Sequence, residues 1–99
     1  MFMVESVWRL EVNLLVIKII GIAKANNIMY IDNQVEIQMI NKMVMVILAA
    51  RQYNGIVLET VPNMPKDKNQ IVVCSSIIFD TFEHLEEFKE ACPKILNQE

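Results

Sequence analysis

The chain has 99 residues, of which 54% are apolar and 21% are charged, and its formal net charge is -3. This length allows one domain spanning residues 1–99, and the apolar content excludes an intrinsically disordered chain. Two cysteines make at most one bridge, which excludes a disulfide scaffold. The acidic balance argues against a general nucleic-acid binder, because phosphate recognition needs a basic surface.

The first part of the chain is predicted to form two strands. Over residues 4–14, apolar and polar side chains nearly alternate, which is typical of a half-buried strand. Residues 15–23 are almost wholly apolar and rich in β-branched side chains, which suits a strand buried on both faces. We expect a bend near Asn13 between the two. A single helix over about residues 4–20 is the alternative, because polar side chains also recur there four residues apart.

A short strand is expected at 28–31, followed by a helix over 34–53. Asn33 is placed as an N-cap with Glu36 completing a capping box, and Asn54-Gly55 is a left-handed stop signal. Two sets of apolar residues follow helical spacing: Ile37, Ile40, Val44 and Ile47, and Met39, Met43, Val46, Ala50 and Tyr53. Such a wide apolar face suits a helix that is covered on more than one side.

The last part of the chain reads as strand, loop, strand and helix. Residues 56–61 and 70–79 are expected strands, which form a long-looped hairpin or lie apart in one sheet. The final helix is predicted over 81–92, capped by Asp80 and ended by Pro93. The predicted fold is therefore α+β, a mixed or mainly antiparallel sheet with two helices (34–53 and 81–92) packed on it.

The segment 28–61 loosely resembles the central strand–helix–strand of the STAS domains of anti-sigma-factor antagonists. Met29-Tyr30-Ile31-Asp32 and Gly55-Ile56-Val57-Leu58 carry the likeness, over about a third of the chain. Asn33 and Gln34 stand where that family has its regulatory serine and its neighbour, and the chain after Val61 is shorter than the family's. The resemblance therefore assigns no family.

One set of residues could support nucleophilic catalysis. Asp80 and His84 are four residues apart, so one helix face can present both, and the carboxylate would raise the basicity of the imidazole. If Cys74 lay nearby, its thiol would have a base. In the alternative, purely structural interpretation, Asp80 caps a helix, His84 is an exposed helix residue and Cys74 is a small apolar strand residue. This interpretation is the simpler one, and we predict no catalytic residues and consider an enzyme the less favoured class.

Metal and cofactor sites are not predicted. Asp80, His84 and Glu87 could offer ligands from one helix, but the chain has one histidine and no paired-cysteine spacing. With only Gly21 and Gly55, no glycine-rich phosphate loop can form. A pocket for a small apolar ligand could be lined by Trp8, Met39 and Met43, although methionines at helical spacing more often fill a core.

Composition favours association with another molecule. Ordinary domains are roughly 45–50% apolar when Gly is counted and Tyr is not. On that count this chain stays at 54%, since two Gly replace two Tyr. A spanning helix would need about twenty apolar residues, but the longest charge-free apolar run, residues 43–50, has eight. We therefore expect a self-associating interaction module, homo-oligomeric and without a membrane span; another protein partner stays open.

Two other functions remain as alternatives, a binder of a small apolar ligand and an enzyme using Cys74 and His84. We read residues 12–25 as core and not as a targeting segment, because Lys18 interrupts their apolar run. The two cysteines are then expected to be reduced thiols in a cytoplasmic protein.

Overall fold

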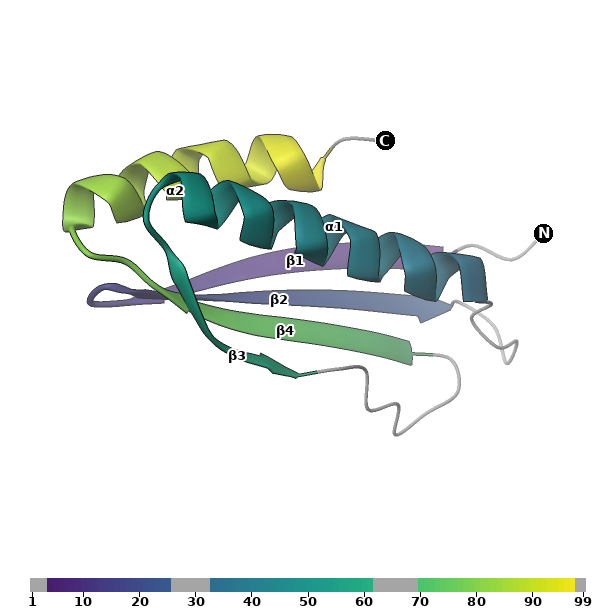
Figure 1. The fold of residues 1–99 in the computed structure, drawn as a ribbon. Coiled ribbons are helices and arrows are strands. Elements are labelled where there is room, and N and C mark those ends of the chain that lie inside the picture. The colour runs from purple at the N-terminus through teal and green to yellow at the C-terminus, as the bar shows by residue number, and fades with distance from the viewer. Residues whose placement is uncertain (1–3, 26–32, 62–69, 98–99) are drawn as a thin grey trace.

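The computed structural model describes residues 4–25, 33–61 and 70–97, so the strand expected at 28–31 lies outside the described residues. The strands are β1 (Val4–Asn13), β2 (Val16–Ala25), β3 (Ile56–Val61) and β4 (Gln70–Ile78), and the helices are α1 (Asn33–Gln52) and α2 (Phe82–Leu96). In the described chain the strands form one antiparallel sheet in the order β1-β2-β4-β3. Both helices lie on the same face of it (Figure 1). The predicted α+β class is confirmed.

The N-terminal segment is a hairpin of two ten-residue strands, which excludes the single-helix alternative. The strands pair from Val4 opposite Ala25 to Asn13 opposite Val16, so the turn falls at Leu14 and Leu15, next to the expected bend. Leu14 has a φ of 55°, a left-handed conformation that costs a leucine about 1–2 kcal/mol. The hairpin register holds the turn in place despite this local cost.

The element order strand–strand–helix occurs twice in the described chain. The two hairpins meet through their second strands, β2 and β4, which pair antiparallel at the centre of the sheet. The two helices run side by side in opposite directions, α1 over β2 and β4 and α2 nearer β1 (Figure 1). The β3–β4 pairing confirms the hairpin interpretation of the two later strands.

Helix α1 ends where the sequence indicated. Asn54 takes a φ of 63°, and the backbone N–H of Gly55 donates to the carbonyl of Ala50 at 2.8 Å. A Cβ on Gly55 would lie 2.9 Å from that carbonyl and from side-chain atoms of Ile77 and Phe79. Asn54 therefore supplies the left-handed turn, while Gly55 is required by the close approach of β4 and its continuation.

Helix α2 corrects the prediction at both ends. Thr81 is the N-cap, and its hydroxyl accepts from the His84 backbone N–H at 3.1 Å, so the expected cap at Asp80 is wrong by one residue. The helix continues through Pro93 to Leu96 instead of ending at residue 92. Proline removes the N–H that would bond the Lys89 carbonyl. Both residues lie at the surface, where water can satisfy that carbonyl.

The core lies between the helices and the central strands. Along β4 and on to Phe79 just after it, alternate residues from Ile71 are buried, as the strand period of two requires. Phe88 of α2 packs against Phe79 with ring centroids 5.2 Å apart and against Tyr53 at 6.5 Å. The buried apolar side chains are Ile17, Ile19, Ala23, Met39, Met43, Val46, Ala50, Ile71, Val73, Ile77, Phe79, Leu85, Phe88, Cys92 and Leu96.

Candidate protein-association surface

The outward side of α1 carries a line of large apolar side chains in water. We call them the outer stripe, and their exposed fractions are 55% for Ile37, 44% for Ile40, 47% for Val44, 44% for Met45 and 53% for Leu48. Ile37, Ile40, Val44 and Leu48 follow one another at steps of three or four residues, and Met45 lies three residues before Leu48, so all five share one side of the helix. The residues of α1 that reach the core lie on the opposite side of the helix. The helix is therefore apolar on two sides, and the fold covers one.

The outer stripe has few charges around it. The charged side chains of α1 are Glu36, Lys42 and Arg51. Lys42 is turned toward α2, where its Nζ donates to the Leu96 carbonyl at 2.8 Å. Glu36 and Arg51 stand near opposite ends of the helix, and the exposed polar side chains between them are the amides of Gln38 and Asn41. Depletion of charge around an exposed apolar centre is typical of protein interfaces.

Helix α2 has a different outer surface. Its buried residues form a single stripe of Leu85, Phe88, Cys92 and Leu96. Its exposed side is mainly acidic, with Glu83, Glu86, Glu87 and Glu90 all exposed. This is the usual amphipathic helix with a solvated face. Helix α1 therefore differs from α2 in exposing a line of apolar side chains.

The sheet face turned away from the helices is a second apolar surface. Its central side chains, Ile20, Ile22, Val72, Cys74 and Ile78, are half-buried, because neighbouring strands partly cover one another's side chains. Exposed charges flank them, with Glu11 opposite Lys18 across the hairpin. Two large apolar residues, Ile56 and Leu58, are exposed on the edge strand β3. We call this surface the open sheet face.

The structure does not bring the predicted catalytic residues together. Cys74 lies on the open sheet face, between buried neighbours that point to the helix layer. His84 lies on α2, on the other side of the sheet. Ser75 points to the helix layer and is buried, where its hydroxyl donates to the Glu59 carbonyl at 3.2 Å. The thiol of Cys74 therefore has no histidine beside it.

Asp80 and His84 do form a pair, with 2.7 Å between Oδ1 and Nδ1. This hydrogen bond raises the pKa of His84 above its ordinary value and lowers that of Asp80, to which the amide of Asn54 also donates at 3.2 Å. The group ties the start of α2 to the end of α1. Burial raises the pKa of the Cys92 thiol to about 11, so that thiol is protonated at neutral pH.

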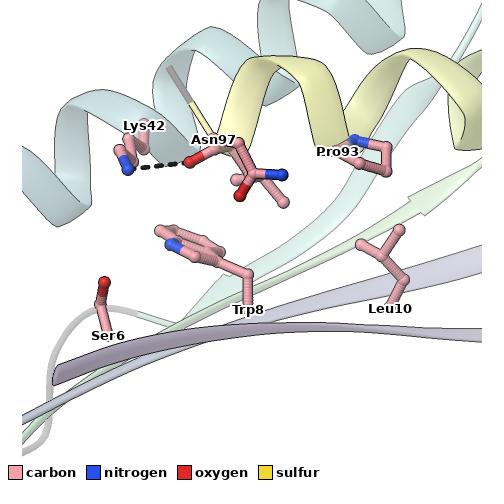
Figure 2. Close-up of a pocket in the computed structure, with 7 residues that line it drawn as sticks. Ser6, Trp8, Leu10, Lys42, Pro93 and Asn97 are labelled. Atoms are coloured by element: carbon pink, nitrogen blue, oxygen red, sulfur yellow. Dashed lines mark hydrogen bonds between the residues drawn. The ribbon is translucent and has the colours of Figure 1, made fainter. Parts of the chain in front are cut away.

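A hollow of about 330 Å³ lies between β1, Lys42 and the end of α2 (Figure 2). It is lined by Ser6, Trp8, Leu10, Lys42, Pro93, Leu96 and Asn97. The Trp8 ring lies across Gly21 of β2, where a Cβ would come within 2.5 Å of it. The buried Trp8 Nε1 has no hydrogen-bond partner in the described part of the chain.

The other two predicted ligand residues lie elsewhere. Met39 is buried and lines a neighbouring hollow of about 120 Å³, which shares Ser6 and Lys42 with the larger one. Met43 is buried in the core and lines neither of these hollows. The structure therefore separates the expected trio, and only Trp8 reaches the larger hollow.

Within residues 4–25, 33–61 and 70–97, no three His, Cys, Asp or Glu side chains are grouped to hold a metal ion. Neither of the helices described in these ranges is long and apolar enough to cross a membrane. Comparisons with known protein families, curated proteins and solved structures find no match to this chain. Fold and surface together define a two-layer α+β domain with one helix apolar on both sides.

Sequence reasoning missed how the two apolar sets on α1 are divided. The set with Met39 and Met43 faces the core, while Ile37, Ile40 and Val44 of the other set face water and its fourth member, Ile47, packs against the core. Both have the same helical period, so periodicity could not rank them. A usable signal was the group of amides beside Ile37, Ile40 and Val44 on the helix, which are those of Gln34, Gln38 and Asn41.

Proposed function

We propose that this protein is a small non-enzymatic association module that binds a second copy of itself through the outer stripe of α1. The observation that carries the proposal is the outer stripe itself, five aliphatic side chains each about half exposed along one helix. Monomeric proteins rarely leave continuous apolar patches in water, and larger ones mark interaction sites.

The size of the apolar contribution supports a reversible complex. Fully burying one aliphatic side chain contributes about 1.5–3 kcal/mol, so completing the burial of a half-exposed one contributes about 1 kcal/mol. Five such side chains from each of two copies give a gross contribution of about 10 kcal/mol. Association itself costs about 4–15 kcal/mol. The two terms are close, so contacts around the outer stripe decide the affinity.

The test is the mass in solution as a function of concentration, by light scattering or sedimentation. We expect the mass to rise from the 11.5 kDa of one chain toward twice that value. Val44→Lys should abolish the rise, because it places a charge at the centre of the outer stripe. Ile56→Lys is the matched control, an exposed aliphatic residue on β3. A wild-type protein that stays monomeric at the highest reachable concentration contradicts the proposal.

A second candidate function is the binding of a small, mainly apolar ligand in the hollow beside Trp8. The specific observation is an indole N–H without a hydrogen-bond partner among the described residues, next to a hollow that Leu10 and Pro93 line together with the polar Ser6, Lys42 and Asn97. Trp8 is the sole tryptophan of the chain, so its fluorescence reports on this place alone. Titration with medium-chain fatty acids should shift the emission. An unchanged spectrum at saturating ligand argues against this function.

A further inference from the structure

We propose that two copies join with their α1 helices antiparallel, about a two-fold axis near the middle of α1, with Glu36 of each copy against Arg51 of the other. The inference rests on the proposed self-association and narrows it to one arrangement. It follows from how the outer stripe and these two charges are placed along and around the helix.

When the helix is reversed, most of the outer stripe is level with other members of the stripe. If the axis passes between Lys42 and Met43, Ile37 of one copy faces Leu48 of the other. Ile40 of one copy is then level with Met45 of the other. Each of these four side chains is 44–55% exposed in the single chain. Side chains three and four residues apart form ridges, and the side chains of a second helix can pack into the grooves between these ridges. A reversed copy therefore places an apolar side chain level with every residue of the outer stripe except Val44, which is level with the exposed amide of Asn41.

The charges lie on the same side of the outer stripe. At 3.6 residues per turn, Arg51 is turned by about 40° and Glu36 by about 100° from Ile37, in the same sense. An antiparallel pair brings the same sides of two helices together. Glu36 of each copy then lies beside Arg51 of the other, which gives two contacts in the dimer. A parallel pair would set each charge level with its like charge on opposite sides of the contact, so neither Glu36 nor Arg51 would gain a partner of opposite sign. Charge placement therefore favours the antiparallel arrangement.

The two charges cannot pair within one chain. They are fifteen residues apart on one helix, a distance of about 22 Å along its axis. Any energetic coupling between Glu36 and Arg51 must therefore act between copies. Opposed helix dipoles add a small favourable contribution in the antiparallel arrangement.

The open sheet face is the rival surface. Its central side chains are half-buried already, so a partner gains less from covering each of them, and its exposed Ile56 and Leu58 lie on the edge strand. A contact between the outer stripe of one copy and the open sheet face of another would be head to tail, and such contacts form rings or grow without closing. The outer stripe against itself closes as a dimer, and growth beyond a dimer would overturn the proposal.

The experiment is a charge exchange read by sedimentation. Glu36→Arg and Arg51→Glu should each weaken self-association roughly 5- to 30-fold, since each replaces two attractive contacts by two repulsive ones. The double variant should recover to within about threefold of wild type, because it restores both contacts. An equimolar mixture of the two single variants should associate as tightly, since every contact is then attractive. Glu86→Arg, on the exposed side of α2, is the matched control.

Each outcome has a defined meaning. If Val44→Lys dissociates the dimer while neither single charge variant does, self-association through α1 stands and the antiparallel arrangement is overturned. If the single variants weaken the dimer but neither the double variant nor the mixture recovers, the pairing of Glu36 with Arg51 is wrong. If Ile56→Lys alone dissociates it, the open sheet face is the interface. Circular dichroism confirms that each variant is folded.

Discussion

At the scale of single residues, a few close contacts decide local structure. Gly21 is buried opposite Trp8 in the first hairpin, where the indole occupies the space of a side chain. Thr81 caps α2, while Asp80, one residue earlier, holds His84 and Asn54. Adjacent residues thus have different roles that composition alone could not separate.

Gly21→Ala should destabilise the protein by about 1–3 kcal/mol, the usual cost of overpacking a close contact. Its Cβ would lie 2.5–2.8 Å from three carbon atoms of the Trp8 ring, so the ring must move. Urea unfolding followed by circular dichroism measures the loss. A Gly21→Ala, Trp8→Leu double variant should lose less than the sum of the two single variants. Strict additivity would show that the ring is not the obstacle.

The Asp80–His84 pair should make stability depend on pH. The pKa of His84 is raised above 6.5, so its contribution is complete below pH 6.5 and is lost as pH rises through the raised value. The pKa of Asp80 is lowered below 3.8, so its contribution is complete above pH 3.8 and is lost as pH falls through the lowered value. Both contributions are present together between these limits.

His84→Gln should therefore lower the free energy of unfolding more near about pH 5 than near about pH 9. Denaturant unfolding of the variant and the wild type at both pH values measures the difference. Lys89→Gln, exposed on the same helix, is the control. An equal loss at the two pH values would show that the pair contributes nothing through its charges.

At the scale of elements, the two helices differ in kind. Helix α2 buries one stripe and shows an acidic face to water, so local pattern and tertiary packing agree. Helix α1 has apolar side chains around most of its circumference, and packing selects one side for the core. The second side is what makes α1 the candidate for association.

Thr81→Ala should destabilise α2 and the protein by about 1 kcal/mol, because the His84 backbone N–H loses its acceptor. Thr81→Ser keeps the hydroxyl and should stay close to the wild type. Thermal and urea unfolding report both effects. If Thr81→Ala matches the wild type, the start of α2 is satisfied by water and the cap is not required.

At the scale of the whole molecule, the two layers leave two apolar surfaces, the outer stripe and the open sheet face. A free cysteine distinguishes them, since Cys74 lies half-buried on the open sheet face. Cys92 lies buried among the core residues of α2. The two thiols therefore report on surface coverage and on global unfolding.

A thiol reagent at neutral pH should modify Cys74 well before Cys92. The Cys92 thiol is buried and its pKa is raised to about 11, so it should react only when the protein unfolds. Mass spectrometry after timed labelling gives both rates, with Cys74→Ser as the control. Association through α1 should leave the Cys74 rate unchanged with concentration. Protection of Cys74 at high concentration would indicate a partner on the open sheet face.

By itself the sequence determined the strands β1, β2, β3 and β4, both helices and the α+β class. These depend on local period and on stop signals such as Asn54, which neighbouring residues set among themselves. The ends of α2 were predicted wrongly, because Asp is the stronger N-cap residue by type although Thr81 makes the cap, and because Pro93 is tolerated at an exposed position.

Only the tertiary structure decided which surfaces remain uncovered and which side chains meet. The period of a helix marks apolar stripes but does not say which one a sheet will cover, so the outer stripe of α1 became visible only with packing. Strand alternation likewise put Cys74 and His84 on opposite sides of the sheet. Burial depends on contacts between residues that are distant in the chain, and local sequence patterns do not predict those contacts.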